Sequence, residues 1–348
     1  MKTNRIFSGL VVGMLGLAGA NSAIAGAIIY NTGSAGTASV ALGVNTEGHL
    51  NTSGAGNIVV NSGVTGLAYK FPDGAWRDAT SPGCYCEGWG VSASGVSGYA
   101  NISTDGGVTN LTVDSFVTDA AAGSGSFATS TVHLSSMPGL KVTQAYSAAD
   151  TSPSLFKDVV TITNTTGGTL TDVRYVRVMD WDIPYSEFSE MVTIKGTATT
   201  SLLEVSHNNG FNTANPLADY GQIYPSCGIT VDFTDCGSAD HGAYFRFNFG
   251  TLADGESYTF TIFYGATGTE ALANTAIAAE GIELYSYGQS DVDGLGGDPV
   301  TGVPATYIFG FKGVGGVAQD PTVPEPASLI LMGLGLLGIG ALRRRRVS

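Results

Sequence analysis

Alternating apolar and polar residues mark the second half of the chain and predict a run of β-strands. Apolar residues occupy every second position over residues 229–233, 245–249 and 258–264. A strand points successive side chains to opposite faces, so each of these stretches predicts a strand with one buried face. Residues 126–134 and 141–146 predict two further strands.

Two longer stretches, residues 157–164 and 170–180, are joined by a short segment that contains Gly167 and Gly168. Strand-like runs separated by about three to five residues with glycine predict a β-hairpin. We therefore expect these two strands to pair with each other.

One helix is predicted, over residues 271–279. Thr269 is of a type that caps helix N-termini, and Glu270 places an acid in the first turn, where the helix dipole favours it. Gly281 weakens the helix beyond that point. Many strands with short connections and a single helix favour a mainly β fold, a large antiparallel β-sandwich with one short helix.

The sandwich is predicted to extend over residues 26–316, with N-terminal strands at 27–30 and 56–60. A smaller N-terminal subdomain that reaches to about residue 115 is the alternative, because this part of the chain is richer in Gly, Ser and Asn. The Gly-rich stretch near the C-terminal tail predicts a linker over residues 317–322.

The first 25 residues have the order of a secretory signal. Basic residues among the first five precede an apolar stretch at 6–20, and Ala23 and Ala25 form the small-residue pattern that signal peptidase cleaves. The apolar stretch is shorter than the roughly 20 residues that a membrane helix needs. We expect residues 1–25 to be removed as a signal peptide, and an uncleaved anchor is the alternative.

The C-terminal tail has three parts in a fixed order. A Pro-Glu-Pro motif comes first, residues 327–342 follow without a charge, and an arginine run ends the tail. As a helix the uncharged part would reach roughly 24 Å, enough to span a membrane with some thinning. Arginines after a span stay on the cytoplasmic side, so the preceding chain is expected to face outward. The motif and the basic end are Val323, Pro324, Glu325, Pro326, Arg343, Arg344, Arg345 and Arg346.

This tail resembles the PEP-CTERM sorting signal, in which a Pro-Glu-Pro motif, a transmembrane helix and a basic end are recognised by an exosortase. The resemblance covers residues 323–348 and concerns sorting, not activity. It implies transient anchoring in the inner membrane, cleavage near the motif, and delivery to the cell surface or extracellular matrix of a Gram-negative bacterium that makes exopolysaccharide. A plain C-terminal membrane anchor is the alternative.

A second resemblance concerns the body of the chain. Residues 83–92 (GCYCEGWGVS), 178–183 (VMDWDI) and 308–312 (IFGFK) are similar to segments that recur together in exported proteins with this type of tail. The similarity implies a shared fold over most of residues 26–316, and it implies no activity.

Charge narrows the possible partners. The whole chain has a net charge of −14, and setting aside the six basic residues of the two ends leaves nine basic residues against 29 acidic ones, or about −20. Such a surface repels phosphate backbones, so nucleic acid is not expected as a partner. The same acidity favours solubility and leaves room for divalent cations.

The four cysteines are expected to form disulfides, because the chain is routed through an oxidising compartment. Cys227 and Cys236 are close in sequence and favour a local bridge. A bridge between Cys84 and Cys86 closes a very small ring. A zinc site is the weaker alternative, because the cysteines are either separated by one residue or widely spaced and none has a histidine directly beside it.

Asp180 and Asp182 are the residues most suggestive of chemistry, at the end of a predicted strand. Residues two apart on a strand share a face, so their carboxylates can share a cation, or act as an acid and base pair, while Trp181 faces the other way. The structural alternative is that they close a turn or pair with Arg174 and Arg177.

Asp291, Asp293 and Asp298 lie in a Gly-rich segment that is partly similar to a calcium loop. The segment lacks the full spacing and the final glutamate of an EF-hand. The segment thus suggests Ca²⁺ as a cofactor, and an acidic Gly-rich loop is the alternative here.

The sequence favours a non-enzymatic surface or matrix protein associated with exopolysaccharide or biofilm matrix. The histidines are scattered, and no serine lies in a nucleophile elbow. The alternative is a domain that binds or processes carbohydrate, with aromatic and acidic side chains on one face. The residues of that alternative site are Trp76, Trp89, Trp181, Asp180 and Asp182.

Overall fold

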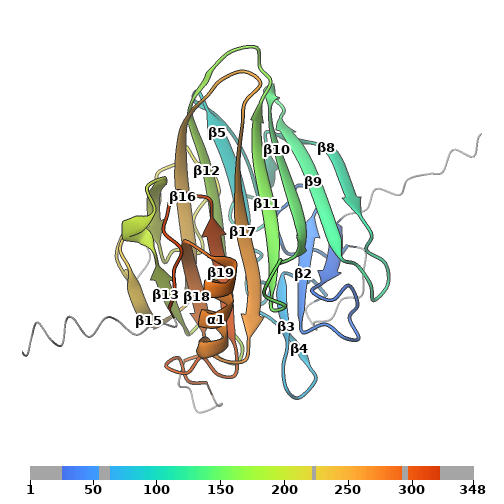
Figure 1. Ribbon diagram of the computed structural model, residues 1–348, viewed down its shortest axis with the longest axis vertical. Coiled ribbons are helices and arrows are strands. Elements are labelled where there is room, and N and C mark those ends of the chain that lie inside the picture. Colours follow the sequence, from blue (N-terminus) through green and yellow to red (C-terminus); the bar gives the residue numbers. More distant parts are fainter. Residues whose placement is uncertain (1–25, 55–62, 222–224, 292–296, 322–348) are drawn as a thin grey trace, which may run out of the picture.

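The computed structural model describes residues 26–54, 63–221, 225–291 and 297–321. This part of the chain forms three antiparallel β-sheets and one α-helix (Figure 1). The mainly β character that the alternating pattern predicts is confirmed. The expected signal peptide, the strand at 56–60 and the sorting tail lie outside the described residues.

The largest sheet has nine strands and forms one complete layer of the molecule (Figure 1). Its strands, in spatial order, are β15 (Phe233–Ala239), β13 (Glu190–Lys195), β18 (Leu284–Gln289), β19 (Thr306–Lys312), β17 (Ser257–Thr267), β11 (Leu155–Asn164), β10 (Met137–Ala148), β9 (Phe127–Leu134) and β8 (Leu111–Thr118).

Two smaller sheets pack against the inner face of this layer. The six-stranded sheet consists, in spatial order, of β14 (Leu203–His207), β16 (His241–Leu252), β12 (Leu170–Trp181), β5 (Gly88–Ala93), β6 (Val96–Asn101) and β7 (Gly107–Thr109). The four-stranded sheet consists of β1 (Gly26–Tyr30), β2 (Val40–Asn45), β3 (Leu67–Lys70) and β4 (Trp76–Asp78). The first 115 residues therefore contribute strands to all three sheets.

One apolar core joins the three sheets. Phe245 of β16 packs edge to face on Phe311 of β19, with ring centroids 5.0 Å apart, and Tyr69 of β3 packs on Tyr307 of β19. Aromatic pairs of this kind stabilise by about 0.5–1.5 kcal/mol beyond the area they bury. The four-stranded and the six-stranded sheet thus each contact the nine-stranded sheet through this core.

Helix α1 (Glu270–Glu280) lies over the outer face of the large sheet (Figure 1). The Thr269 side chain accepts a hydrogen bond from the Leu272 amide, and Gly281 ends the helix in the left-handed conformation with φ of 65°. On its buried side the apolar Ile277 belongs to a cluster with Tyr285 and Ile308 of the sheet. The predicted helix and its cap are confirmed.

The strands predicted at 245–249 and 258–264 are confirmed within β16 and β17. The strand predicted at 229–233 is wrong, because β15 begins only at Phe233. Thr230 has a positive φ of 51°, and Val231 is 48% exposed. The Asp232 carboxylate accepts backbone amides of residues 196 and 197. These side-chain bonds hold the segment in a turn, so the alternation does not become a ladder.

The predicted hairpin of residues 157–164 and 170–180 is also wrong. Both strands exist, but β11 pairs with β10 and β17 in the large sheet, whereas β12 pairs with β16 and β5 in the six-stranded sheet. The Asn164 amide donates to the carbonyls of Gly168 and Leu252, which turns the chain from one layer to the other. Glycine-containing connections of this length suit an arch between sheets as well as a hairpin.

The body of the protein continues beyond residue 316. The Glu283 carboxylate accepts the amides of Gly313, Val314 and Gly316, and the Gln319 amide donates to the Ile282 carbonyl. The start of the predicted linker at 317–322 is therefore attached to the β-domain. No helix among the described residues is long and apolar enough to cross a membrane.

Candidate functional site

A group of carboxylates lies where β12 ends. In the ladder between β12 and β16, Asp180 lies opposite Gly242, and the turn that precedes β16 presents Asp240 beside it. Ligand oxygens of Asp180, Asp182 and Asp240 all lie within 4.8 Å of one another. The prediction that Asp180 and Asp182 share a face is confirmed, and Asp240 joins them from a distant part of the sequence. We call these three residues the acidic cluster.

Two members of the acidic cluster are buried. Asp180 is 1% exposed and Asp182 is 0% exposed, whereas Asp240 is exposed. Glu190, the first residue of β13, is also buried, and the three carboxylates of the cluster act electrostatically on it. The site is therefore closed on the protein side, and Asp240 lies where it meets solvent.

Several carboxylate oxygens at this site have no hydrogen-bond partner. They are Asp180 Oδ1, Asp182 Oδ1, Asp182 Oδ2 and Glu190 Oε2. Burying an unpaired polar atom costs about 1–3 kcal/mol, and more when the group is charged. Four such atoms at one point of the fold indicate a site whose ligand would supply the missing interactions.

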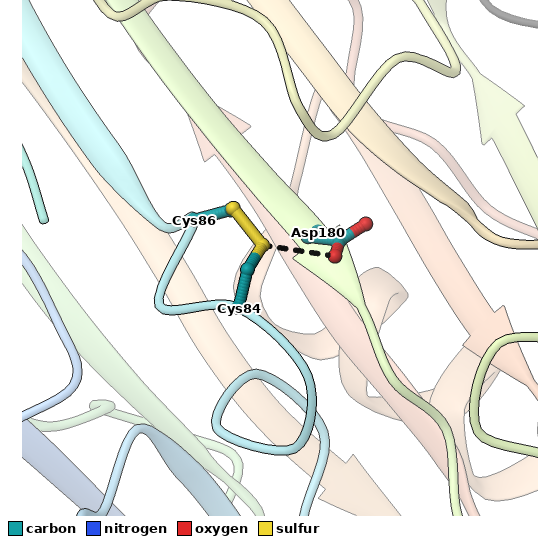
Figure 2. Close-up of side chains that lie close together, drawn as sticks. All are labelled: Cys84, Cys86 and Asp180. Carbon is teal, nitrogen blue, oxygen red and sulfur yellow. Dashed lines mark hydrogen bonds between the residues drawn. A yellow bond between two sulfur atoms is a disulfide. The ribbon is translucent and has the colours of Figure 1, made fainter. Parts of the chain in front are cut away.

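The disulfide between Cys84 and Cys86 lies against the cluster (Figure 2). Cys84 Sγ is 3.4 Å from Asp180 Oδ2, and this is the contact drawn in Figure 2. A disulfide sulfur carries no proton, so it supplies no hydrogen to the carboxylate. The bridge closes this side of the site without neutralising it.

The basic residues expected as partners of these carboxylates lie elsewhere. Arg177 pairs with Glu87, Nε to Oε1 at 2.5 Å, and Arg174 pairs with Asp172 and Glu204. Among the described residues no ion pair involves the acidic cluster or Glu190. The alternative that Asp180 and Asp182 pair with Arg174 and Arg177 is therefore wrong.

Burial raises the pKa values of the carboxyl groups at this site. Burial, together with the nearby Asp182 and Asp240, raises the pKa of Asp180 well above its usual range. Burial also raises the pKa of Asp182 to about 8, and that of Glu190 to about 10 despite a hydrogen bond from the His241 amide. Without a positive partner, the protein favours the protonated forms.

Glycines let the backbone approach these carboxylates closely. A Cβ on Gly210 would lie 2.8 Å from Asp180 Oδ1, and one on Gly242 would lie 2.0 Å from the Met179 carbonyl oxygen. Gly83 has a positive φ of 63°, and a Cβ there would lie 3.1 Å from Asp182 Oδ1. Larger residues at these positions would need the carboxylates or the backbone to move.

The three tryptophans do not line the acidic cluster as a group. Trp181 is fully buried in the core, as its position between the two aspartates predicts, and donates from Nε1 to Ser286 Oγ. Trp89 is also fully buried and donates to the Glu47 carbonyl, while Trp76 is partly buried against Tyr30 of the small sheet. They form no joint aromatic face for a sugar.

The second predicted calcium segment has a different character. Asp298 caps its own turn, with Oδ1 accepting the Val300 amide and Oδ2 accepting the Thr301 hydroxyl. The Asp291 amide donates to Ser186 Oγ, and Asp293 lies outside the described residues. The geometry of Asp298 matches the alternative of an acidic loop.

Both pairs of neighbouring cysteines are bonded. Cys227 joins Cys236, as predicted, and Cys84 joins Cys86. The first bridge ties the turn before β15 to that strand. The second lies in the loop between β4 and β5. With all four sulfurs in disulfides, no thiolate ligand for zinc exists here.

Sequence reasoning missed Asp240 and Glu190 as neighbours of the predicted pair. Asp240 directly precedes β16, which pairs with β12, and Glu190 begins β13, where it lies opposite Ala239 of β15. Only these strand pairings bring the two residues close to Asp180. The sequence signal available was an acid at a strand boundary, which by itself is common in turns.

A separate, polar pocket of about 420 Å³ lies between α1 and strands β13, β15 and β18. Its lining offers hydrogen-bonding groups of both kinds, including Lys195, Asp232, Asn274, Tyr285 and Gln319. The pocket lies on the same side of the large sheet as the helix, away from the acidic cluster at the end of β12.

The family model described as the PEP-CTERM protein-sorting motif matches residues 322–346. No curated protein and no solved structure matches the chain.

Proposed function

Starting from the PEP-CTERM sorting motif at residues 322–346, which marks an exported protein sorted by an exosortase, we propose that this protein is a non-enzymatic component of the cell surface or extracellular matrix. Signal peptidase removes residues 1–25 during export. The tail then anchors the chain in the inner membrane until exosortase cuts near the Pro-Glu-Pro motif. The released β-domain reaches the surface or biofilm matrix of a Gram-negative bacterium.

The single observation that carries this proposal is the sorting motif. The character of the body supports it, because an antiparallel β-domain with two local disulfides suits an oxidising, extracellular setting. Several charged and aromatic residues near the candidate site have structural roles instead. Arg177 forms a buried ion pair with Glu87, and two tryptophans are buried in the core. In this proposal exopolysaccharide is the partner of the outer surface.

The carbohydrate-binding alternative fits the polar pocket better than the acidic cluster. Sugars are held by paired donors and acceptors, and Lys195, Asn274 and Gln319 supply both around a hollow of about 420 Å³. The proposed test is cosedimentation of the purified protein with exopolysaccharide from a producing strain. Lys195→Ala should reduce binding several-fold, whereas Lys141→Ala on β10 should not. Equal binding by both variants would remove this alternative.

The sorting proposal is tested by replacing Pro324, Glu325 and Pro326 together with alanine. The variant should stay in the inner-membrane fraction, because exosortase no longer recognises the tail. A matched control is Val317→Ala, an exposed position six residues before the motif, which should be released like the wild type. Normal release of the triple variant to the envelope or medium would contradict the proposal.

A further inference from the structure

We infer that the acidic cluster of Asp180, Asp182 and Asp240 is a binding site for a divalent cation, with Ca²⁺ as the fitting ion. The inference is independent of the sorting route, since it rests only on the geometry at the end of β12. The cation would join the end of β12 to the turn that precedes β16, with the Glu190 carboxyl group beside it.

The unpaired oxygens give the first reason. Asp182 has two and Asp180 has one, on side chains that are 0% and 1% exposed. Protons can satisfy some of these atoms only by keeping the carboxyls neutral. A divalent cation within reach of all three residues satisfies oxygens from each of them at once, and it turns their mutual repulsion into attraction.

The donor set gives the second reason and selects the class of metal. The three candidate ligands are carboxylates, which suit hard cations. The nearby sulfurs are tied up in the disulfide of Cys84 and Cys86. The His241 ring contacts the Asn208 amide through Nδ1 and the Glu190 carbonyl through Nε2, so neither nitrogen is free for a metal. Soft or borderline metals therefore lack their preferred ligands here.

Calcium fits better than magnesium for two reasons. Ca²⁺ accepts about six to eight oxygens in irregular geometry, including bidentate carboxylates, whereas Mg²⁺ demands a near-octahedral shell and retains water. The ligands here come from two adjacent strand ends, where Gly83 and Gly210 let the backbone lie close to the carboxylates. Asp240 is exposed, which gives the ion a route of entry and leaves positions for water.

The test uses the purified exported chain after treatment with EDTA. Thermal unfolding is followed with added CaCl₂ or MgCl₂, and binding is followed by Tb³⁺ luminescence excited through the aromatic residues. Ca²⁺ at about a hundredfold excess over its Kd should raise Tm by roughly 5 °C, with a smaller effect of Mg²⁺. Ca²⁺ should also displace the Tb³⁺ signal.

Two variants locate the ion. Asp182→Asn keeps the side-chain shape, and it should abolish the Ca²⁺-induced rise in Tm and weaken Tb³⁺ binding at least tenfold. The metal-free variant should be at least as stable as the metal-free wild type, because one buried carboxylate is gone. The control is Asp298→Asn, which changes a carboxylate that caps its own turn and should leave the Ca²⁺ response intact.

If Asp182→Asn does not fold, Asp240→Asn replaces it, because an exposed side chain can be changed without disturbing the core. That variant should weaken Tb³⁺ binding at least several-fold. The proposal is overturned if the wild type shows neither a Ca²⁺-dependent Tm nor Tb³⁺ luminescence. It is also overturned if the response survives in these variants, or is lost only in Asp298→Asn.

Discussion

Arg177 and Asp180 are three residues apart on β12, yet Arg177 is paired with an opposite charge and Asp180 is not. Arg177 points into the core between the sheets, where Glu87 accepts from Nε at 2.5 Å and Gln144 accepts from Nη1 at 2.7 Å. Its remaining hydrogens reach Tyr175, Tyr146 and the Gly48 carbonyl. Asp180 faces the other side of the strand and meets more carboxylates.

The comparison separates two uses of a buried charge. Burying an ion costs several kcal/mol, which only a partner with good hydrogen bonds offsets. For Arg177 that partner comes from within the chain, since its guanidinium pairs with Glu87. The second oxygen of Glu87 accepts a hydrogen bond from the Leu50 amide. At the acidic cluster the chain brings only further carboxyl groups, so the compensation comes from outside the chain, from bound protons or from the proposed cation.

The largest effect is expected from Arg177→Met. The substitution leaves Glu87 buried without its partner, and breaking a buried pair in this way costs about 3–5 kcal/mol. Urea unfolding monitored by tryptophan fluorescence measures the loss. A change in the free energy of unfolding below about 1 kcal/mol would show that the buried Glu87 does not need Arg177 as its partner. The contrast between the paired and the unpaired site would then not hold.

A second prediction concerns Asp158 of β11, which is fully buried within the field of the same arginine. Burial raises the pKa of Asp158 to about 7, although Arg177 opposes the shift. The folded state thus holds a proton that the unfolded chain releases above about pH 4. Stability is full below pH 4 and falls as the pH rises to about 7.

Asp158→Asn should therefore match the wild type near pH 4 and become more stable than it by on the order of 3 kcal/mol above pH 7. Unfolding free energies of both proteins, measured in EDTA from pH 4 to pH 8, give this difference directly. A constant difference across that range would mean that Asp158 is ionised in the folded protein throughout.

The third prediction concerns Glu190, which lies beside the acidic cluster and has no basic partner among the described ion pairs. Glu190→Gln replaces a carboxyl group that burial keeps protonated with an uncharged amide of the same shape, and Oε1 can still accept the His241 amide. In EDTA the variant should gain about 1 kcal/mol of stability. Chemical denaturation in EDTA provides the measurement. A loss of stability similar to that of Arg177→Met would show that Glu190 is itself part of a satisfied network.

The smallest effect is expected from Arg174→Gln, on the same strand as Arg177. Its side chain is 23% exposed and its partners are Asp172 and Glu204, so water replaces the lost contacts. The cost should stay below about 1 kcal/mol and shrink in high salt. Equal losses for the two arginine variants would mean that burial is not what distinguishes them.

The sequence predicted the local elements better than their assembly. Residues 245–249 and 258–264 form strands as expected, because a single buried face fixes the alternation. The same alternation at 229–233 fails, since the Asp232 side chain bonds to backbone amides and holds a turn. The pairing of β11 and β12 with strands of different sheets depends on contacts far along the chain, which spacing does not reveal.

The candidate site shows the same limit. Asp180 and Asp182 could be found because their spacing places them together on one strand end. Asp240 comes from sixty residues away, and Glu87 is separated from Arg177 by ninety, so both partnerships exist only through strand pairing. Sequence spacing thus indicated the acidic pair, but the alternative that Arg177 pairs with these aspartates is wrong, because Arg177 pairs with Glu87.

The most direct measurement is X-ray diffraction from crystals soaked in TbCl₃, with a matched crystal kept in EDTA. An anomalous peak is expected among the carboxylates of Asp180, Asp182 and Asp240, and none there in the EDTA crystal. A Tb³⁺-soaked crystal with no peak at these three residues, or with peaks only at surface carboxylates, would contradict the proposed cation site.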